Sequence, residues 1–207
     1  MLRQAPAVFR SRINDVLLAA LAWALSRWTG RDRVLVNLEG HGREDIFDGV
    51  DLTRTVGWFT SAYPVALTVQ ETDWPALVRS VRGQLRAVPG NGLGFGLLRY
   101  LGRRPELAGP GAAEPEVAFN YLGQWKLPEG GAGDGLYHAF HPSLGQDQSP
   151  ADRAVHPVEI VGAAEGGRLR FTWRYAKDRY DEAAVRAVAA DFLLALERIA
   201  EHCAGRS

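Results

Sequence analysis

The sequence contains a single cysteine, Cys203, which excludes both a disulfide framework and a cysteine-based zinc site. Its 24 basic and 24 acidic residues give a formal net charge of zero. No electrostatic attraction to nucleic acid or to an anionic membrane is therefore expected. The histidines do not have the spacing of metal ligands, and no metal site is predicted. We expect a cytoplasmic protein in which Cys203 is buried at the apolar spacing of the last helix.

Long apolar runs are also absent. The run from Val16 to Leu25 is shorter than the roughly 20 residues needed to cross a bilayer. Arg10 and Arg12 precede it and could imitate a secretory signal. Asn14 at its entrance and apolar residues at helical spacing instead favour a core helix that ends at Gly30.

The 207 residues are 46% apolar and 23% charged, which is typical of a soluble globular protein with a sizeable core. Apolar residues at three- and four-residue steps predict helices over residues 13–29, 73–88 and 181–203. Short β-branched or alternating runs predict strands over residues 34–38, 65–69, 117–122, 158–161 and 168–175. The last two strands flank Gly166-Gly167 and form the clearest hairpin. Residues 102–115 and 126–150 are predicted loops. This mixture predicts an α/β fold, a layered mixed sheet with flanking helices.

Glu39 follows the apolar strand at 34–38, and Gly40 and Gly42 leave room for a ligand close to the backbone. A carboxylate serves as acid or base near neutral pH when burial raises its pKa. We therefore expect Glu39 to be buried at the end of its strand. The alternative is an ion pair with Arg43 or Arg54 that holds a turn.

Five segments carry a recognisable pattern in chain order, namely Asn14–Leu21, Glu39–Glu44, Arg54–Pro64, Pro89–Gly96 and Phe119–Trp125. They resemble the motifs of the epimerization domains of nonribosomal peptide synthetases, in the condensation-domain superfamily. The run Glu-Gly-His-Gly-Arg-Glu matches completely. Trp125 is a departure, because the family pattern ends in phenylalanine there.

The resemblance implies one chloramphenicol-acetyltransferase-like lobe, the C-terminal one, over residues 1–207. The first lobe would carry a His-His-x-x-x-Asp-Gly motif, which this sequence does not contain. The family inverts the α-carbon, from L to D, of an aminoacyl or peptidyl thioester held on the phosphopantetheine of a carrier protein. The chain itself is expected to bind no cofactor, and to be inactive without a first lobe.

The resemblance also assigns site residues. Glu39 is one of two acid/base groups, and Asn120 and Tyr121 share its cavity. Tyr121 either hydrogen-bonds the developing oxyanion or is a buried tyrosine with a satisfied hydroxyl. The other predicted cavity residues are His41, Arg43, Trp58 and Phe59. A ring hydrogen bond from His41 is expected to orient its turn, and Trp58 and Phe59 are core or cavity wall.

Two other functions stay open. Condensation domains resemble this chain in fold, but they have an Asn-Arg motif at the Glu39 position and Gly-Phe-Phe-Val-Asn-Thr beyond it. A noncatalytic, carrier-binding orphan lobe is the third hypothesis. The expected partners are a carrier protein and a separate first lobe or a second copy of this chain, and residues 126–150 are a candidate for a segment reaching that lobe. A Glu39 side chain open to bulk solvent would count against the isomerase.

Overall fold

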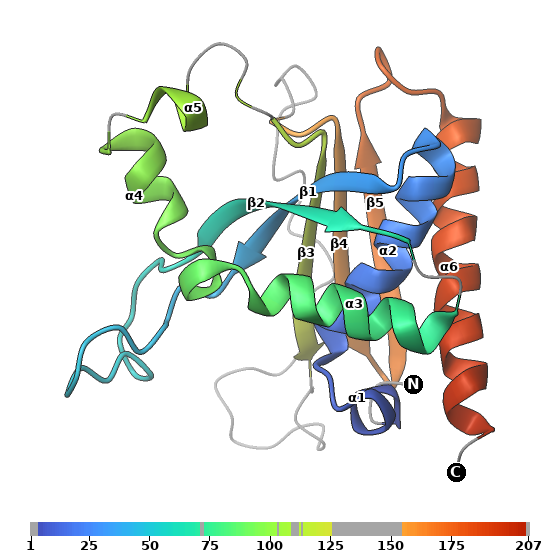
Figure 1. Ribbon diagram of the computed structural model, residues 1–207, viewed down its shortest axis with the longest axis horizontal. Helices are drawn as coiled ribbons and strands as arrows, with labels where there is room; N and C mark the ends of the chain where they lie inside the picture. Colours follow the sequence, from blue (N-terminus) through green and yellow to red (C-terminus); the bar gives the residue numbers. More distant parts are fainter. Residues whose placement is uncertain are drawn as a thin grey trace, which may run out of the picture.

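The computed structural model describes residues 4–70, 73–102, 104–108, 112, 114–125 and 155–205, and the loop predicted at 126–150 lies outside them. A five-stranded sheet has the order β2-β1-β3-β4-β5 (Figure 1). Its strands are β1 (Arg33–Gly40), β2 (Ser61–Thr68), β3 (Val117–Trp125), β4 (Val158–Glu165) and β5 (Arg168–Tyr175). The three central strands are parallel, and both edge strands are antiparallel to their neighbours. The predicted mixed sheet is confirmed.

Three long helices pack against this sheet (Figure 1). The helical elements are α1 (Gln4–Phe9), α2 (Ile13–Thr29), α3 (Trp74–Arg86), η1 (Pro89–Gly92), α4 (Phe95–Tyr100), α5 (Pro105–Ala108) and α6 (Glu182–Ala204). The predictions for α2, α3 and α6 are confirmed. Helix α1 was not predicted, and α5 lies inside a predicted loop, because four to six residues are too few to show a helical period. Among the described helices, none has the length and apolar character to cross a bilayer.

α2 is the central helix of the core. Every residue from Val16 to Ala22 is buried, so the helix is covered on nearly all sides. A helix that is apolar around its circumference is stable only in such a position. The carboxylate of Asp15 accepts a hydrogen bond of 2.7 Å from the backbone N–H of Arg12 and closes the N-terminus. Gly30, with φ 67°, ends the helix in the left-handed region, as the sequence predicts.

Side chains alternate across the sheet and divide it into two faces. On β1, Val34, Val36 and Leu38 point into the core. On β5, the predicted stripe of Leu169, Phe171, Trp173 and Tyr175 packs against the same core. Phe192 of α6 is fully buried there, with its ring centroid 4.8 Å from that of Phe171. Cys203 is also buried, as expected.

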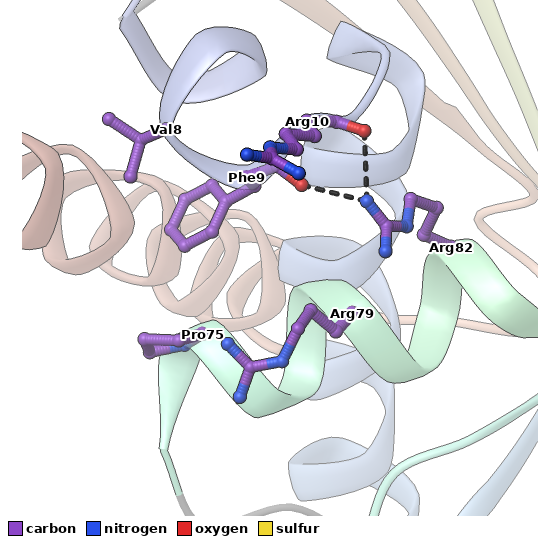
Figure 2. A pocket seen from close by; sticks show the side chains of 6 residues that line it. All are labelled: Val8, Phe9, Arg10, Pro75, Arg79 and Arg82. Carbon is purple, nitrogen blue, oxygen red and sulfur yellow. Dashed lines mark hydrogen bonds between the residues drawn. The ribbon is translucent and has the colours of Figure 1, made fainter.

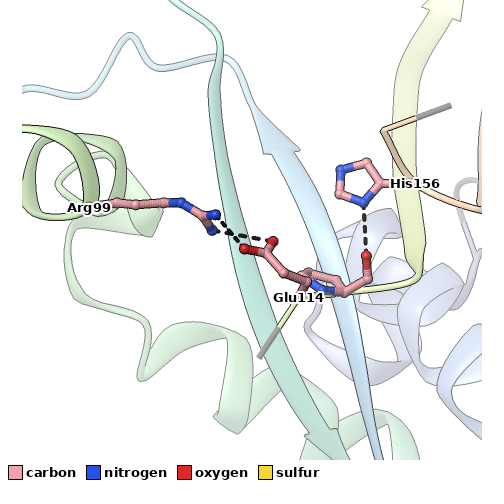
Figure 3. A network of polar contacts seen from close by, with 4 residues as sticks. Arg99, Glu114 and His156 are labelled. Carbon is pink, nitrogen blue, oxygen red and sulfur yellow. Dashed lines mark hydrogen bonds and ion pairs between the residues drawn. The ribbon is translucent and has the colours of Figure 1, made fainter. Parts of the chain in front are cut away.

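Two polar contacts fix the start of the parallel strands (Figure 3). The guanidinium of Arg99, on α4, hydrogen-bonds the carboxylate of Glu114, just before β3. His156, just before β4, donates a hydrogen bond of 2.9 Å from Nδ1 to the carbonyl of Pro115. β3 and β4 therefore begin side by side.

Candidate active site

Glu39 and Asn120 meet on the face of the sheet opposite the core. Parallel pairing of β1 with β3 sets Leu38 beside Phe119, which carries the next residue of each strand to the same face. The Asn120 side chain donates a hydrogen bond of 2.6 Å from Nδ2 to Oε2 of Glu39. The fold therefore joins two predicted site residues that lie far apart in the sequence.

The expectation that Glu39 is buried is wrong for this chain, because its side chain is exposed. Val34, Val36 and Leu38 occupy the core face, so strand alternation turns residue 39 outward. The alternative ion pair with Arg43 is wrong as well, since that guanidinium bonds the carbonyls of Leu52 and Gly57. Glu39 thus has an amide partner and an exposed side chain, and it would be desolvated only if this face of the sheet were covered.

Tyr121 does not join this pair. It follows Asn120 in β3, so its side chain points to the other face, where it packs against the core. Burial raises the pKa of its phenol. The cavity expected to contain Asn120 and Tyr121 together is therefore not formed by these described residues.

His41, Arg43 and Phe59 organise the loop between β1 and β2. The ring of His41 accepts a hydrogen bond of 3.0 Å at Nδ1 from the backbone N–H of Arg43, the turn-orienting contact that the sequence predicted. The Arg43 guanidinium lies 4.2 Å above the Phe59 ring. In this chain, these three residues hold the loop through contacts with one another and with its backbone.

Trp58 is 90% exposed, so the interpretation of this residue as core is wrong. Val56, two residues earlier, is 99% exposed. Neighbouring apolar side chains in water often mark a contact surface. The cavity-wall role of Trp58 is compatible with this position only if the loop is covered.

The sequence reasoning missed a second polar link, between Glu44 and Asn91. Asn91 donates a hydrogen bond of 2.8 Å from Nδ2 to Oε2 of Glu44, and Nε2 of His41 lies 3.6 Å from Oε1. Burial raises the pKa of the Tyr63 phenol, and the negative charge of Glu44 raises it further. The sequence did contain a signal for this link, because Glu44 and Asn91 belong to two of the five recognised segments.

Two features require glycine at position 42: the backbone conformation there and the close approach of Phe59. The φ of Gly42 is 64°, and a Cβ added there would lie 1.6 Å from the carbonyl oxygen of Phe59. Gly49 of the same loop has φ 78° but nothing within 4 Å of an added Cβ. The two glycines therefore separate the effect of backbone strain from that of a steric clash.

Gly42→Ala is expected to loosen the loop far more than Gly49→Ala. Both changes incur the left-handed backbone penalty of about 1–2 kcal/mol, but only the first forces two backbone segments apart. Amide hydrogen exchange over residues 41–60 should accelerate about tenfold more in Gly42→Ala, which corresponds to about 1.4 kcal/mol. Equal exchange in both variants would show that the contact between Gly42 and Phe59 does not hold the loop.

Within the part of the chain that the structure describes, no group of three or more histidine, cysteine, aspartate or glutamate side chains is arranged to hold a metal ion. The described site consists of one carboxylate with its amide partner and a loop fixed by hydrogen bonds. This arrangement can present a carboxylate for proton transfer once the surrounding water is displaced.

Comparison with known proteins gives consistent results. The family model of the condensation domain matches residues 2–207. One of the linear gramicidin synthase proteins of Brevibacillus parabrevis is 42% identical over 205 residues, which are 98% of this chain and 4% of that protein. Bacitracin synthase 3 of Bacillus licheniformis is 41% identical over 207 residues, which are 100% of this chain and 3% of that protein. The chain thus spans a small part of the curated relatives it matches.

Solved structures agree with the family match. The epimerization domain from the third module of tyrocidine synthetase B has a TM-score of 0.84 and 36% identity, covering 98% of this chain and 44% of that one. The first condensation domain of the CDA synthetase has a TM-score of 0.61 and 18% identity, covering 96% and 42%. The second likeness concerns the fold alone. The matched family model, which spans nearly the whole chain, shows that this protein belongs to the condensation-domain family.

Proposed function

We propose that the chain is the C-terminal lobe of an epimerization domain of a nonribosomal peptide synthetase. Its substrate would be an aminoacyl or peptidyl thioester on the phosphopantetheine of a carrier protein, inverted at the α-carbon from L to D. The single observation that carries the proposal is the Glu39 carboxylate at the end of β1, held 2.6 Å from the Asn120 amide.

Removal of a proton from the α-carbon requires a base, and a carboxylate can act as one. Glu39 would take the α-proton, so that the C–H bond breaks and the electron pair moves into the thioester carbonyl. A proton would then return to the opposite face of the α-carbon. The Asn120 amide bonds Oε2, which leaves Oε1 as the oxygen for the proton. One carboxylate serves one face only, so inversion needs a second acid on the other side.

Exposure of Glu39 determines what the chain needs from a partner. A carboxylate surrounded by water is a weak base, and desolvation is what makes it effective. We infer that a first lobe covers the face of the sheet that carries Glu39 and supplies the second acid. The exposed Trp58 and Val56 would lie in the same contact. The chain alone would therefore be inactive, even with a loaded carrier protein present.

Epimerization is favoured over condensation by two observations. The chain is 36% identical to the epimerization domain of tyrocidine synthetase B and 18% identical to the condensation domain of the CDA synthetase. In addition, Glu39 stands where the resembling condensation domains have an Asn-Arg motif. A carboxylate suits proton removal from carbon, whereas an amide at this position does not.

The test is α-deuterium incorporation from deuterated water into an L-aminoacyl thioester on a loaded carrier protein. Two samples are compared: the chain alone, and the chain with a first lobe taken from an epimerization domain. Deuterium in the mixture only supports the proposal. Peptide formation without deuterium, when a second loaded carrier is added, would replace it with condensation. Carrier binding without either reaction would leave a noncatalytic lobe.

A further inference from the structure

A cavity of about 200 Å³ lies between α1 and α3, away from Glu39. Its lining is Val8, Phe9, Arg10, Pro75, Arg79 and Arg82. Figure 2 shows the three arginines around the opening, with Phe9 beside them. Glu39 lies elsewhere, because the end of β1 at Gly40 is close to Asn91, which follows the C-terminal end of α3. The cavity faces the first turns of that helix.

Arg82 forms the fixed wall of the cavity. Its Nη1 donates hydrogen bonds of 2.8 Å to the carbonyls of both Phe9 and Arg10, which are unpaired groups at the end of α1. A guanidinium carries five N–H donors, so those on Nη2 and Nε remain for a ligand. The contact with α1 holds this charge in place.

Within the described ranges, Arg10 and Arg79 have no carboxylate of their own. None of the ion pairs among the described residues involves either side chain, or Arg82. The nearby carboxylate of Asp73 caps α3 by accepting a hydrogen bond from the backbone N–H of Ala76. Three positive charges thus line one cavity with no neutralising partner from the part of the chain described, and a bound anion would relieve their mutual repulsion.

The backbone of Arg10 gives an independent reason to assign a role to its side chain. Its φ is 48°, and Asn91 is the one other non-glycine residue with positive φ in the described ranges. At the end of a helix this conformation favours glycine. Arginine is less stable than glycine in this backbone conformation, but it places a guanidinium at the cavity rim.

We propose that this cavity is a binding site for a phosphate group, either free or as a monoester. The volume is below the 300–1,000 Å³ typical of sites for drug-sized ligands, so a small oxyanion fits it best. Guanidinium forks match the geometry of phosphate oxygens. The apolar side formed by Val8, Phe9 and Pro75 would accept the carbon substituent of an ester.

Isothermal titration with inorganic phosphate and with phenyl phosphate, at constant ionic strength, tests the site. We expect saturable binding of at least one, and the tighter of the two identifies a free or an esterified ligand. Sodium acetate at the same ionic strength should bind at least about tenfold more weakly, because a monovalent carboxylate satisfies fewer of the donors. Comparable acetate affinity would overturn the assignment to phosphate.

Arg10→Gly is the decisive variant, since it should lower phosphate affinity about tenfold or more while leaving the melting temperature unchanged or raised. Arg79→Gln should weaken binding to a similar extent. Arg86→Gln is the matched control, because Arg86 is exposed on the same helix but does not line the cavity. Absence of saturable binding, affinity unaffected by Arg10→Gly, or an equal loss in Arg86→Gln would each overturn the proposal. None of these outcomes depends on activity at Glu39.

Discussion

Glu39→Gln is expected to lower the rate of α-deuterium incorporation by about 10²- to 10⁴-fold, the usual contribution of a general base. The substitution replaces the atom that would receive the proton with an amide that cannot hold it at neutral pH. The rate is measured with the chain and a complementing first lobe, on a loaded carrier protein. Glutamine keeps an oxygen that can accept the hydrogen bond from Asn120, so the local structure should persist.

Glu159→Gln is the matched control for this experiment. Glu159 lies on the same face of the sheet as Glu39 but on β4, two strands away, where it pairs with Ala118 rather than with Asn120. Its replacement should leave the exchange rate within about twofold, because it holds no position near the transferred proton. Full exchange in Glu39→Gln would remove this carboxylate from the mechanism, and with it the proposed isomerase role.

Phe192→Ala should have the largest effect on stability, about 3–5 kcal/mol of the free energy of unfolding. The Phe192 side chain is fully buried on α6, with its ring centroid 4.8 Å from that of Phe171 and 6.0 Å from that of Trp173. Alanine would leave a cavity where the last helix meets β5. Urea denaturation followed by tryptophan fluorescence measures the change, because Trp173 reports directly on this contact.

Leu193→Ala, at the next position of the same helix, is the corresponding surface control. Its side chain is 52% exposed, so truncation should change stability by less than about 1 kcal/mol. If Phe192→Ala were no less stable than Leu193→Ala, then Phe192 would not be packed in the core as described. The packing of α6 against β5 would then need revision.

The sequence was sufficient to predict those parts of the fold that depend on residues close together in the chain. The hairpin of β4 and β5 forms around Gly166-Gly167, and the alternation along β5 assigns each residue to its face correctly. The helix α6 begins where Asp181 caps it, through a hydrogen bond of 3.1 Å from the Ala184 N–H. Such features depend on neighbours in sequence, which a single sequence displays.

The candidate site depended on information that the sequence does not display. The contact of Glu39 with Asn120 exists because β3 inserts between β1 and β4, and strand order cannot be read from apolar periods. The exposure of Glu39 and Trp58 depends likewise on what does or does not cover them. The orientation of Tyr121, by contrast, could have been predicted from the sequence. Adjacent residues of a strand face opposite sides of the sheet, and Asn120 immediately precedes Tyr121.

The central position of α2 has a consequence for the order of biosynthesis. Its partner α6 comes from the end of the sequence, and the neighbour that completes the pairing of β1 is made more than 70 residues after it. During translation a helix whose residues 16–25 are all apolar therefore leaves the ribosome long before its cover exists. Nascent chains that stall before residue 182 would expose that helix, and chaperones that retain unfinished polypeptides should recognise them.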